Sequence, residues 1–376
     1  MGFGAAPSLA AALGIAGKHV DLARHVAAGK YFFYKKLRVG QLEQTVERLF
    51  KNDILQDLMG RFDAAGEYKK LGDFENYVFE VTYRGKPAIL RVTHSSHRKK
   101  EEIDSELEWM DFLHKNGVTC PGCYRSKQKL WVETAAAEDG SNFYACLYSK
   151  APGSLVKVGS HEFNDKLFFA WGEVIGKMHA VTKGYKPSGH TRPSWDEEEL
   201  LDIEQYVLEN DIVKNTNDLI KELESLPANR SNYGLIHSDV HSGNFFFDGE
   251  TVHVFDFDDC SYHWFASDIA IPLYYSLLYG FPVNDEAEAK KFSVNFYRKF
   301  LTGYQKHNEL PTDLFKQLPL FLRLRDITLY SVLEKKVPLE ERNENTINMM
   351  DKIRNRILSN RAIIDLSEDE IMSVNS

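Results

Sequence analysis

The feature that most constrains this chain is the polar stretch "HSDVHSGN" at 237–244. It stands between the apolar stretches "YGLI" (233–236) and "FFF" (245–247). Short apolar runs bounded by turn residues are typical of buried strands, so the polar stretch is predicted to be a loop between them. Two histidines, an aspartate and an asparagine in such a loop indicate one of two sites. Either the loop binds a metal directly, or it is a catalytic loop whose metal arrives with a substrate.

Residue spacing favours the catalytic loop. Phosphoryl-transfer enzymes need a carboxylate that orients the attacking hydroxyl, an Asn five residues later, and oxygen ligands for Mg²⁺. Asp239 and Asn244 have this spacing, and Asp256 in "FDFDD" offers a second metal-binding carboxylate. The apolar segments 245–247 and 252–255 are predicted to be two strands that bring the loop ends side by side.

A direct metal site remains the rival interpretation. Alternate residues of a strand point the same way, so His237, Asp239 and His241 could bind zinc or iron. That interpretation ignores the distant elements, which the kinase interpretation uses. Two plainer alternatives also stay open: a turn rich in Asx residues that bond locally, and, for His237, a buried histidine bonded to the backbone.

Periodicity divides the chain into a strand-rich half and a helical half. Apolar residues at helical spacing predict helices over 42–62, 100–117 and 167–182, with Gly117 ending the second. A further helix is expected around 197–210, and mostly helices from 266 to about 361. β-formers predict strands at 77–83, 87–93, 129–134 and 142–150, the first two joined by a hairpin turn at "RGK" (84–86).

The strand-rich half contains candidates for nucleotide binding. Kinase sites place a cation on the third strand, paired with a Glu on the next helix. Arg91 in "AILRVT" and Glu106 in "EIDSELEW" fit these places, with Glu102 as second choice of partner. Gly72 and Asn76 in "LGDFENYVF" (71–79) are the candidates for cradling phosphates. The plain alternative for Arg91 and Glu106 is an exposed salt bridge, which contributes under about 1 kcal/mol.

Taken together, these motifs resemble the aminoglycoside phosphotransferase and choline kinase family of protein-kinase-like enzymes. The resemblance covers about residues 65–335 and is carried by "YGLIHSDVHSGNFFFD", "VHVFDFDDCSYHWFASDIA", "EVIGKMHAVT", and "ILRV" followed by "SELEWMDFLHKNGV". It implies an α+β, bilobal protein-kinase-like fold with a small antiparallel-sheet N-lobe and a larger helical C-lobe. By the same resemblance, His241 would lie near the γ-phosphate, and Asp268 would brace the catalytic loop.

The resemblance implies an ATP-dependent (or GTP-dependent), Mg²⁺-dependent phosphotransferase that acts on a small-molecule hydroxyl. Asp239 would orient and deprotonate that hydroxyl, Asn244 and Asp256 would hold the metal, and Arg91 would bind the phosphates. Aminoglycosides, choline and homoserine are acceptors of such enzymes. Candidate acceptor-binding residues are Asp258, Trp264, Tyr275, Arg323 and Asp326. A Ser/Thr protein kinase and a non-catalytic kinase-like binding protein, both of the same fold, are the alternatives.

Length and composition set the remaining expectations. A chain of 376 residues suggests two lobes: an extension over 1–40, a nucleotide-binding lobe over 41–150, and a helical catalytic and acceptor-binding lobe over 151–376. A net charge of −9 argues against nucleic-acid binding, and no apolar run is long enough to span a membrane. Four scattered cysteines favour the cytoplasm. The oligomeric state is left open.

Overall fold

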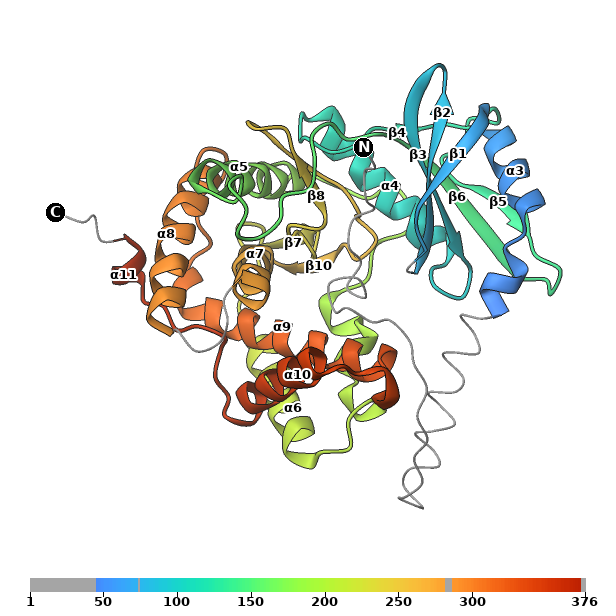
Figure 1. Ribbon diagram of the computed structural model, residues 1–376. Helices are drawn as coiled ribbons and strands as arrows, with labels where there is room; N and C mark the ends of the chain where they lie inside the picture. Colours follow the sequence, from blue (N-terminus) through green and yellow to red (C-terminus); the bar gives the residue numbers. More distant parts are fainter. Residues whose placement is uncertain (1–44, 74, 281–285, 373–376) are drawn as a thin grey trace, which may run out of the picture. The chain divides into compact units, whose positions relative to one another are not determined.

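The computed structural model describes residues 45–73, 75–280 and 286–372 (Figure 1). These residues form two compact units. The first takes its described residues from the ranges 1–107, 122–150 and 331–350, and the second from 108–121, 151–330 and 351–376. The predicted α+β class is confirmed, since the first unit contains an antiparallel sheet and the second is mainly helical. The 1–40 extension lies outside the described residues.

The sheet of the first unit has the strand order β1-β2-β3-β6-β4, with β5 also paired to β6. All of its pairings are antiparallel. Arg84 and Gly85, with φ of 50° and 76°, form the two-residue turn between β2 and β3, a conformation that suits tight hairpins. The hairpin predicted from "RGK" is therefore confirmed. The strands are β1 (Ala64–Gly72), β2 (Asn76–Tyr83), β3 (Lys86–His94), β4 (Cys123–Tyr124), β5 (Glu133–Ala136) and β6 (Asn142–Ser149).

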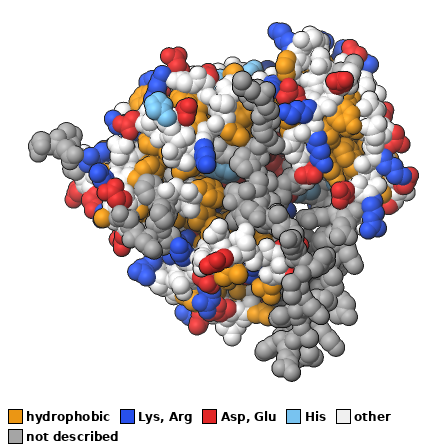
Figure 2. All heavy atoms as spheres, viewed as in Figure 1, with side chains coloured by type: hydrophobic (Ala, Val, Ile, Leu, Met, Phe, Trp, Pro, Cys, Tyr) orange, Lys and Arg blue, Asp and Glu red, His pale blue; other side chains and the backbone are white. Residues whose placement is uncertain are grey.

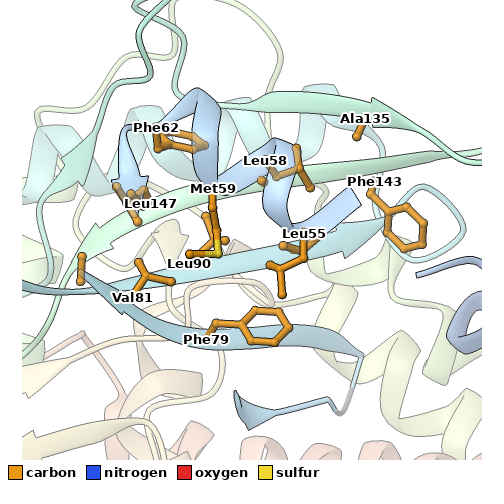
Figure 3. Packing of buried hydrophobic residues seen from close by; sticks show 14 of the residues in the cluster. Leu55, Leu58, Met59, Phe62, Phe79, Val81, Leu90, Ala135, Phe143 and Leu147 are labelled. Carbon is orange, nitrogen blue, oxygen red and sulfur yellow. The ribbon is translucent and has the colours of Figure 1, made fainter. Parts of the chain in front are cut away.

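Helix α3 (Asn52–Arg61) supplies the apolar side chains that cover this sheet (Figure 3). Leu55, Leu58 and Met59 are buried against residues of the strands, among them Leu90 and Phe143. This single cluster holds β3 and β6 in place from one side, so the residues that they carry have a fixed backbone. Among those residues is Arg91.

Two predictions for this unit are wrong in detail. The helix expected over 42–62 is interrupted: residues 45–49 are helical, and α3 begins only at Asn52. The interruption lets the ring of Phe50 stack on Tyr77 of β2, with ring centroids 4.2 Å apart; residues 42–44 lie outside the described part. Strand β1 was not predicted, because its exposed residues 66–70 show no apolar alternation.

Helix α4 (Lys100–Lys115) follows β3, as the sequence predicts. Gly117, with φ of 77°, ends it, and the N–H of Val118 donates to the carbonyl of Leu113 at 3.0 Å. This closure is typical of a helix that stops at a left-handed glycine. The strand expected at 129–134 begins later than predicted, at Glu133.

Two strand pairs and a set of helices make up the second unit. The strand pairs are β7 (Tyr233–Ile236) with β10 (Ser261–Trp264), and β8 (Phe245–Phe247) with β9 (Val252–Val254). The buried strands expected on both sides of the polar loop are thus present. The helices are α5 (Asp165–Thr182), α6 (Asn210–Glu224), α7 (Phe265–Gly280), α8 (Glu286–Tyr304), α9 (Leu314–Lys336), α10 (Glu344–Leu358) and α11 (Glu368–Met372), with α9 and α10 each shared between the two units.

The helix expected around 197–210 is not there. Residues 195–205 form three short 3₁₀ turns, and the long helix α6 begins only at Asn210. Acidic side chains of this stretch bond to their own backbone: Glu197 accepts from the N–H of Ser194, and Glu198 accepts from that of Leu200. Such local bonds stabilise turns at the expense of a continuous helix.

Helices α5 and α8 touch through their backbones. A Cβ atom built on Gly172 of α5 would lie 1.8 Å from the carbonyl oxygen of Phe300, and one on Gly303 of α8 would lie 2.0 Å from that of Phe169. Only glycine permits so close an approach. The contact fixes α5, which carries His179 next to the loop described below.

Surface charge is mixed on the face shown in Figure 2, where Lys and Arg side chains are interspersed with Asp and Glu. Within the described ranges, no helix is both long and apolar enough to cross a membrane.

Candidate active site

The loop 237–244 connects β7 to β8 and is braced from α7. The carboxylate of Asp268 accepts hydrogen bonds from the N–H groups of His237, at 3.1 Å, and Ser238, at 2.8 Å. His179 of α5 contacts the same carboxylate at 3.3 Å. Ser238 has φ of 68°, a left-handed conformation that costs energy for residues other than glycine and is found at functional sites. The bracing role that the resemblance implied for Asp268 is confirmed.

Three side chains of the second unit contact the carboxylate of Asp239. The amide Nδ2 of Asn244 donates to its Oδ2 at 2.9 Å, and Nε2 of His241 lies 3.3 Å from the same oxygen. Nη2 of Arg325 donates to Oδ1. Burial raises the pKa of Asp239, but the charge of Arg325 and the contact with His241 outweigh burial and lower it to about 2. The group is therefore a carboxylate at neutral pH.

Arg325 is the site residue that sequence reasoning missed. It lies on α9, 86 residues after Asp239, so no spacing rule connects it to the loop. Its Nε and Nη2 donate to the hydroxyl of Tyr275 at 3.0 and 2.6 Å, and its guanidinium carbon lies 4.9 Å from the centre of that ring. Arg323, two residues earlier, was predicted instead; it contacts Asn360 and Glu222.

His241 has a defined orientation. Its Nδ1 accepts from the N–H of Gly243 at 3.0 Å, so the neutral ring carries its hydrogen on Nε2, the atom that faces Asp239. Its ring centre is 4.8 Å from that of Tyr275. A Cβ on Gly243 would come within 2.6 Å of the His241 ring, so glycine is needed beside it.

His237 does not take part in a metal triad. It is buried, and its Nε2 lies 3.1 Å from the carbonyl oxygen of Phe255. Burial lowers its pKa. Among the described residues, no metal-binding group combines His237, Asp239 and His241. The interpretation of His237 as a buried, backbone-bonded histidine is confirmed, and the direct metal site loses its support.

The pairing of β8 with β9 determines the position of Asp256 relative to Asn244. Phe245 pairs with Val254, and the N–H of Phe255 donates to the carbonyl of Asn244 at 2.9 Å, so Asp256 follows directly on a residue bonded to Asn244. Asp256 is exposed and has φ of 65°. Since Asn244 uses Nδ2 to bond Asp239, its carbonyl Oδ1 is the amide atom suited to a cation. These oxygen donors are of the type that Mg²⁺ prefers, and their metal-binding role stays a prediction.

In the first unit, Arg91 and Glu106 form the predicted pair. Nη1 and Nη2 of Arg91 donate to the two carboxylate oxygens of Glu106 at 2.9 and 2.6 Å, and both side chains are buried. Glu102, the second choice, instead accepts from the N–H of Lys99. The exposed salt bridge considered as the alternative is excluded. Phosphate binding by Arg91 stays a prediction.

Gly72 and Asn76 flank the turn between β1 and β2. Gly72 ends β1 and Asn76 begins β2, where its Oδ1 accepts from the hydroxyl of Thr93 at 2.5 Å. The turn is therefore shorter than the phosphate loop expected over 71–79, and residue 74 lies outside the described part. Cradling of phosphates by these two residues stays a prediction.

The predicted acceptor residues differ in their surroundings. Tyr275 is connected to Asp239 through Arg325, as described above. Trp264 is buried, and its indole N–H donates to the carbonyl of Pro227 at 3.0 Å. Asp326 is buried and accepts from Arg356 and Tyr274.

Asp258 is buried as well, and its backbone carbonyl accepts from Arg192 at 2.6 Å. Acceptor binding by any of the five predicted residues stays a prediction.

Comparisons with known proteins identify relatives of this chain. A family model described as "Phosphotransferase enzyme family" matches residues 68–309. A curated relative, the amicoumacin kinase of Bacillus subtilis (strain 168), is 34% identical over 322 residues, which cover 84% of this chain and 95% of the relative.

Two solved structures are similar to the whole fold. An amicoumacin kinase in complex with AMP-PNP, Ca²⁺ and Ami is 32% identical with a TM-score of 0.80, covering 86% of this chain and 98% of that one. A microcompartment-associated aminopropanol kinase, 21% identical with a TM-score of 0.65 and covering 82% and 98%, shares the fold. The predicted protein-kinase-like fold is thereby confirmed. The sequence, the site and these likenesses lead to one conclusion: this chain belongs to the phosphotransferase enzyme family.

Proposed function

We propose that this enzyme transfers the γ-phosphate of ATP to a hydroxyl group of a small molecule, with Asp239 as the base. The observation that carries the proposal is the environment of Asp239. It is held as a carboxylate by Arg325 and His241, and Asn244, five residues later, bonds to it. That spacing and pairing suit phosphoryl transfer.

Asp239 orients the acceptor hydroxyl and receives its proton. A carboxylate whose pKa is lowered to about 2 is too weak a base to remove that proton before the reaction begins. The proton therefore moves to Asp239 as the new O–P bond forms and the acidity of the hydroxyl rises. Positioning and electrostatics are the main contributions of the protein in such reactions.

Asn244, through Oδ1, and Asp256 would hold Mg²⁺, which neutralises phosphate charge when bound. Arg91, held by Glu106, would bind the phosphates, and His241 would lie near the γ-phosphate. Gly72 and Asn76 would support the phosphates from the β1–β2 turn. The related kinase structure with AMP-PNP and Ca²⁺ supports a nucleotide and a divalent ion. ATP is proposed over GTP on this basis.

Amicoumacin is the first acceptor to test, because the relative of that name aligns over 95% of its length. Among the predicted acceptor-binding residues, Tyr275 is the one that bonds Arg325, which in turn bonds Asp239. The other proposed acceptor-binding residues are Asp258, Trp264, Arg323 and Asp326. Choline, an aminoglycoside and homoserine form a comparison panel. The proposed location is the cytoplasm, which the four scattered cysteines of the chain favour.

The test uses the purified full chain with ATP, Mg²⁺ and each acceptor, and detects the phosphorylated product by mass spectrometry. Asp239→Asn is expected to bind ATP normally and to lose transfer by about 10²-fold or more. Asp218→Asn, an exposed change on α6, is the matched control and should keep full activity. Unchanged turnover in Asp239→Asn would end the proposal.

The same assay separates the two alternatives. A protein kinase would transfer radioactive phosphate from ATP to added protein substrates and leave the small molecules unmodified. A non-catalytic binding protein would modify none of them. Absence of Mg²⁺-dependent nucleotide binding would favour that second alternative.

A further inference from the structure

The two oxygens of Asp239 differ in the contacts that they already have. Oδ2 accepts from Nδ2 of Asn244 at 2.9 Å and has Nε2 of His241 at 3.3 Å. Oδ1 accepts from Nη2 of Arg325. Each carboxylate oxygen has about two lone pairs in its plane. Oδ2 faces two nitrogen atoms, whereas Oδ1 faces one and therefore keeps a lone pair for a further donor.

Arg325 is itself held by several bonds. Its Nε and Nη2 both donate to the hydroxyl of Tyr275, its Nη1 lies 3.5 Å from the carbonyl oxygen of Ser238, and the Tyr275 ring lies beneath it. A guanidinium is planar and presents its donors in a fixed arrangement. Rotation of the guanidinium would break these bonds together. The guanidinium therefore stays in one orientation and occupies one fixed side of Oδ1.

Arg325 also lies outside the part of the chain that the family model matches. The match ends at residue 309, and α9, which carries Arg325, begins at Leu314. The contact with Asp239 is thus contributed by a segment beyond the residues that the family model matches. The same is not true of Asn244 and His241, which lie within it.

We propose that Arg325 is a positioning residue that fixes the rotation of the Asp239 carboxylate and leaves Oδ1 as the atom that takes the acceptor's proton. The inference rests on the proposed function. In the step, the O–H bond of the acceptor breaks and its proton passes to Oδ1, while its electron pair remains on the oxygen. That oxygen forms the new bond to the γ-phosphorus. The bond from the γ-phosphorus to the bridging oxygen breaks, and ADP leaves with the electron pair of that broken bond.

The kinetic test compares Arg325→Gln and Arg325→Lys with the control Arg354→Gln on α10, which removes a partly exposed ion pair to Glu209, the residue that precedes α6. Misplacement of a reacting group by about 1 Å costs about 10²-fold in rate. We expect kcat to fall by about that factor in Arg325→Gln, with the KM for ATP unchanged. Arg325→Lys should retain an intermediate rate, because one ammonium cannot bond both Asp239 and Tyr275 in the same geometry.

A third variant separates positioning from folding. In Arg325→Ala, added guanidinium ion should restore part of kcat in a saturable way, and the Tm of each variant should show that it is folded. Unchanged kcat in folded Arg325→Gln would overturn the inference, and so would an equal fall in Arg354→Gln.

A measurement that does not depend on catalysis tests the inference separately from the proposed function. Crystal structures of the wild-type enzyme and of Arg325→Gln should show the Asp239 carboxylate rotated in the variant. An unrotated carboxylate would overturn the inference, whatever the activity. Failure of the wild-type enzyme to phosphorylate any acceptor would instead remove the proposed function, and the two structures would still decide whether Arg325 sets the orientation of Asp239.

Discussion

Arg91 and Glu106 are joined by two hydrogen bonds, of 2.9 and 2.6 Å, in a place where Glu106 is fully buried and Arg91 is 6% exposed. A buried pair of this kind orients the guanidinium, because both of its terminal nitrogens are held by one carboxylate. The pair therefore presents Arg91 in one orientation to any phosphate that binds it.

Removing one partner should destabilise the protein strongly. Glu106→Ala leaves the charge of Arg91 buried without its carboxylate, a change that typically costs about 3–5 kcal/mol. The double variant Arg91→Met, Glu106→Leu should recover most of that stability and yet bind ATP poorly. Urea unfolding and a nucleotide-binding titration measure the two effects. Equal stability of the single and double variants would contradict the explanation.

The backbone contact of α5 with α8 predicts a large effect of a single methyl group. Gly172→Ala places a Cβ 1.8 Å from the carbonyl oxygen of Phe300, so the helices must move apart, at a cost of about 1–3 kcal/mol or more. Gly60→Ala on α3, where nothing lies within 4 Å of the added carbon, is the control. It should stabilise the protein by up to about 1 kcal/mol, because alanine is the better helix former. Thermal unfolding of both variants checks the contrast.

Gly243→Ala should act on His241 and leave the fold intact. The added Cβ would lie 2.6 Å from the ring, so the ring must turn away from Asp239, from which it is now 3.3 Å. We expect kcat to fall by about tenfold or more, within the range of acid–base and positioning effects. Gly189→Ala, which meets nothing within 4 Å, is the control. A variant of normal activity would mean that His241 has no part in the reaction.

Stability should decline with acid because of three buried histidines. Burial lowers the pKa of His179 and His237, and lowers that of His263 to about 3. The folded protein keeps them neutral, whereas the unfolded chain binds protons near pH 6.5. The contribution of the three histidines to the free energy of unfolding is complete above that pH. As the pH falls, this contribution decreases by up to about 1.4 kcal/mol per pH unit for each histidine.

Urea unfolding between pH 7.5 and 4.5 measures this decline. His263→Gln, in which one of the three groups no longer titrates, should show a shallower slope than the wild-type protein. A free energy of unfolding that stays constant over this range would contradict the prediction.

Local patterns were enough to predict those contacts of the candidate site that form within a short stretch of chain. Asp239 and Asn244 are five residues apart, and a loop between two short buried strands leaves them few ways to be arranged. Arg91 and Glu106 were found because a strand followed by a helix puts their side chains on facing surfaces. In each case the physical constraint acts over about fifteen residues or fewer.

Other features depend on contacts that no local pattern reveals. Arg325 of α9 reaches Asp239 through a tertiary contact in which it also bonds Tyr275 of α7. The same helix carries Arg323, an equally plausible cation in sequence. Strand β1 is an exposed edge with polar residues on both faces, so it lacks the alternation that identifies strands. The 197–210 stretch has the composition of a helix, yet its acidic side chains bond to nearby backbone and favour turns.

The position of α9 beyond the matched region has a practical consequence. A shortened protein that stops at residue 309 would keep every motif by which the family is identified, including Asp239, Asn244 and Asp256. It would nevertheless lose Arg325, which bonds the carboxylate of Asp239. Genome surveys that score such fragments by motif alone would count them as complete, and cloning them would yield protein without this contact.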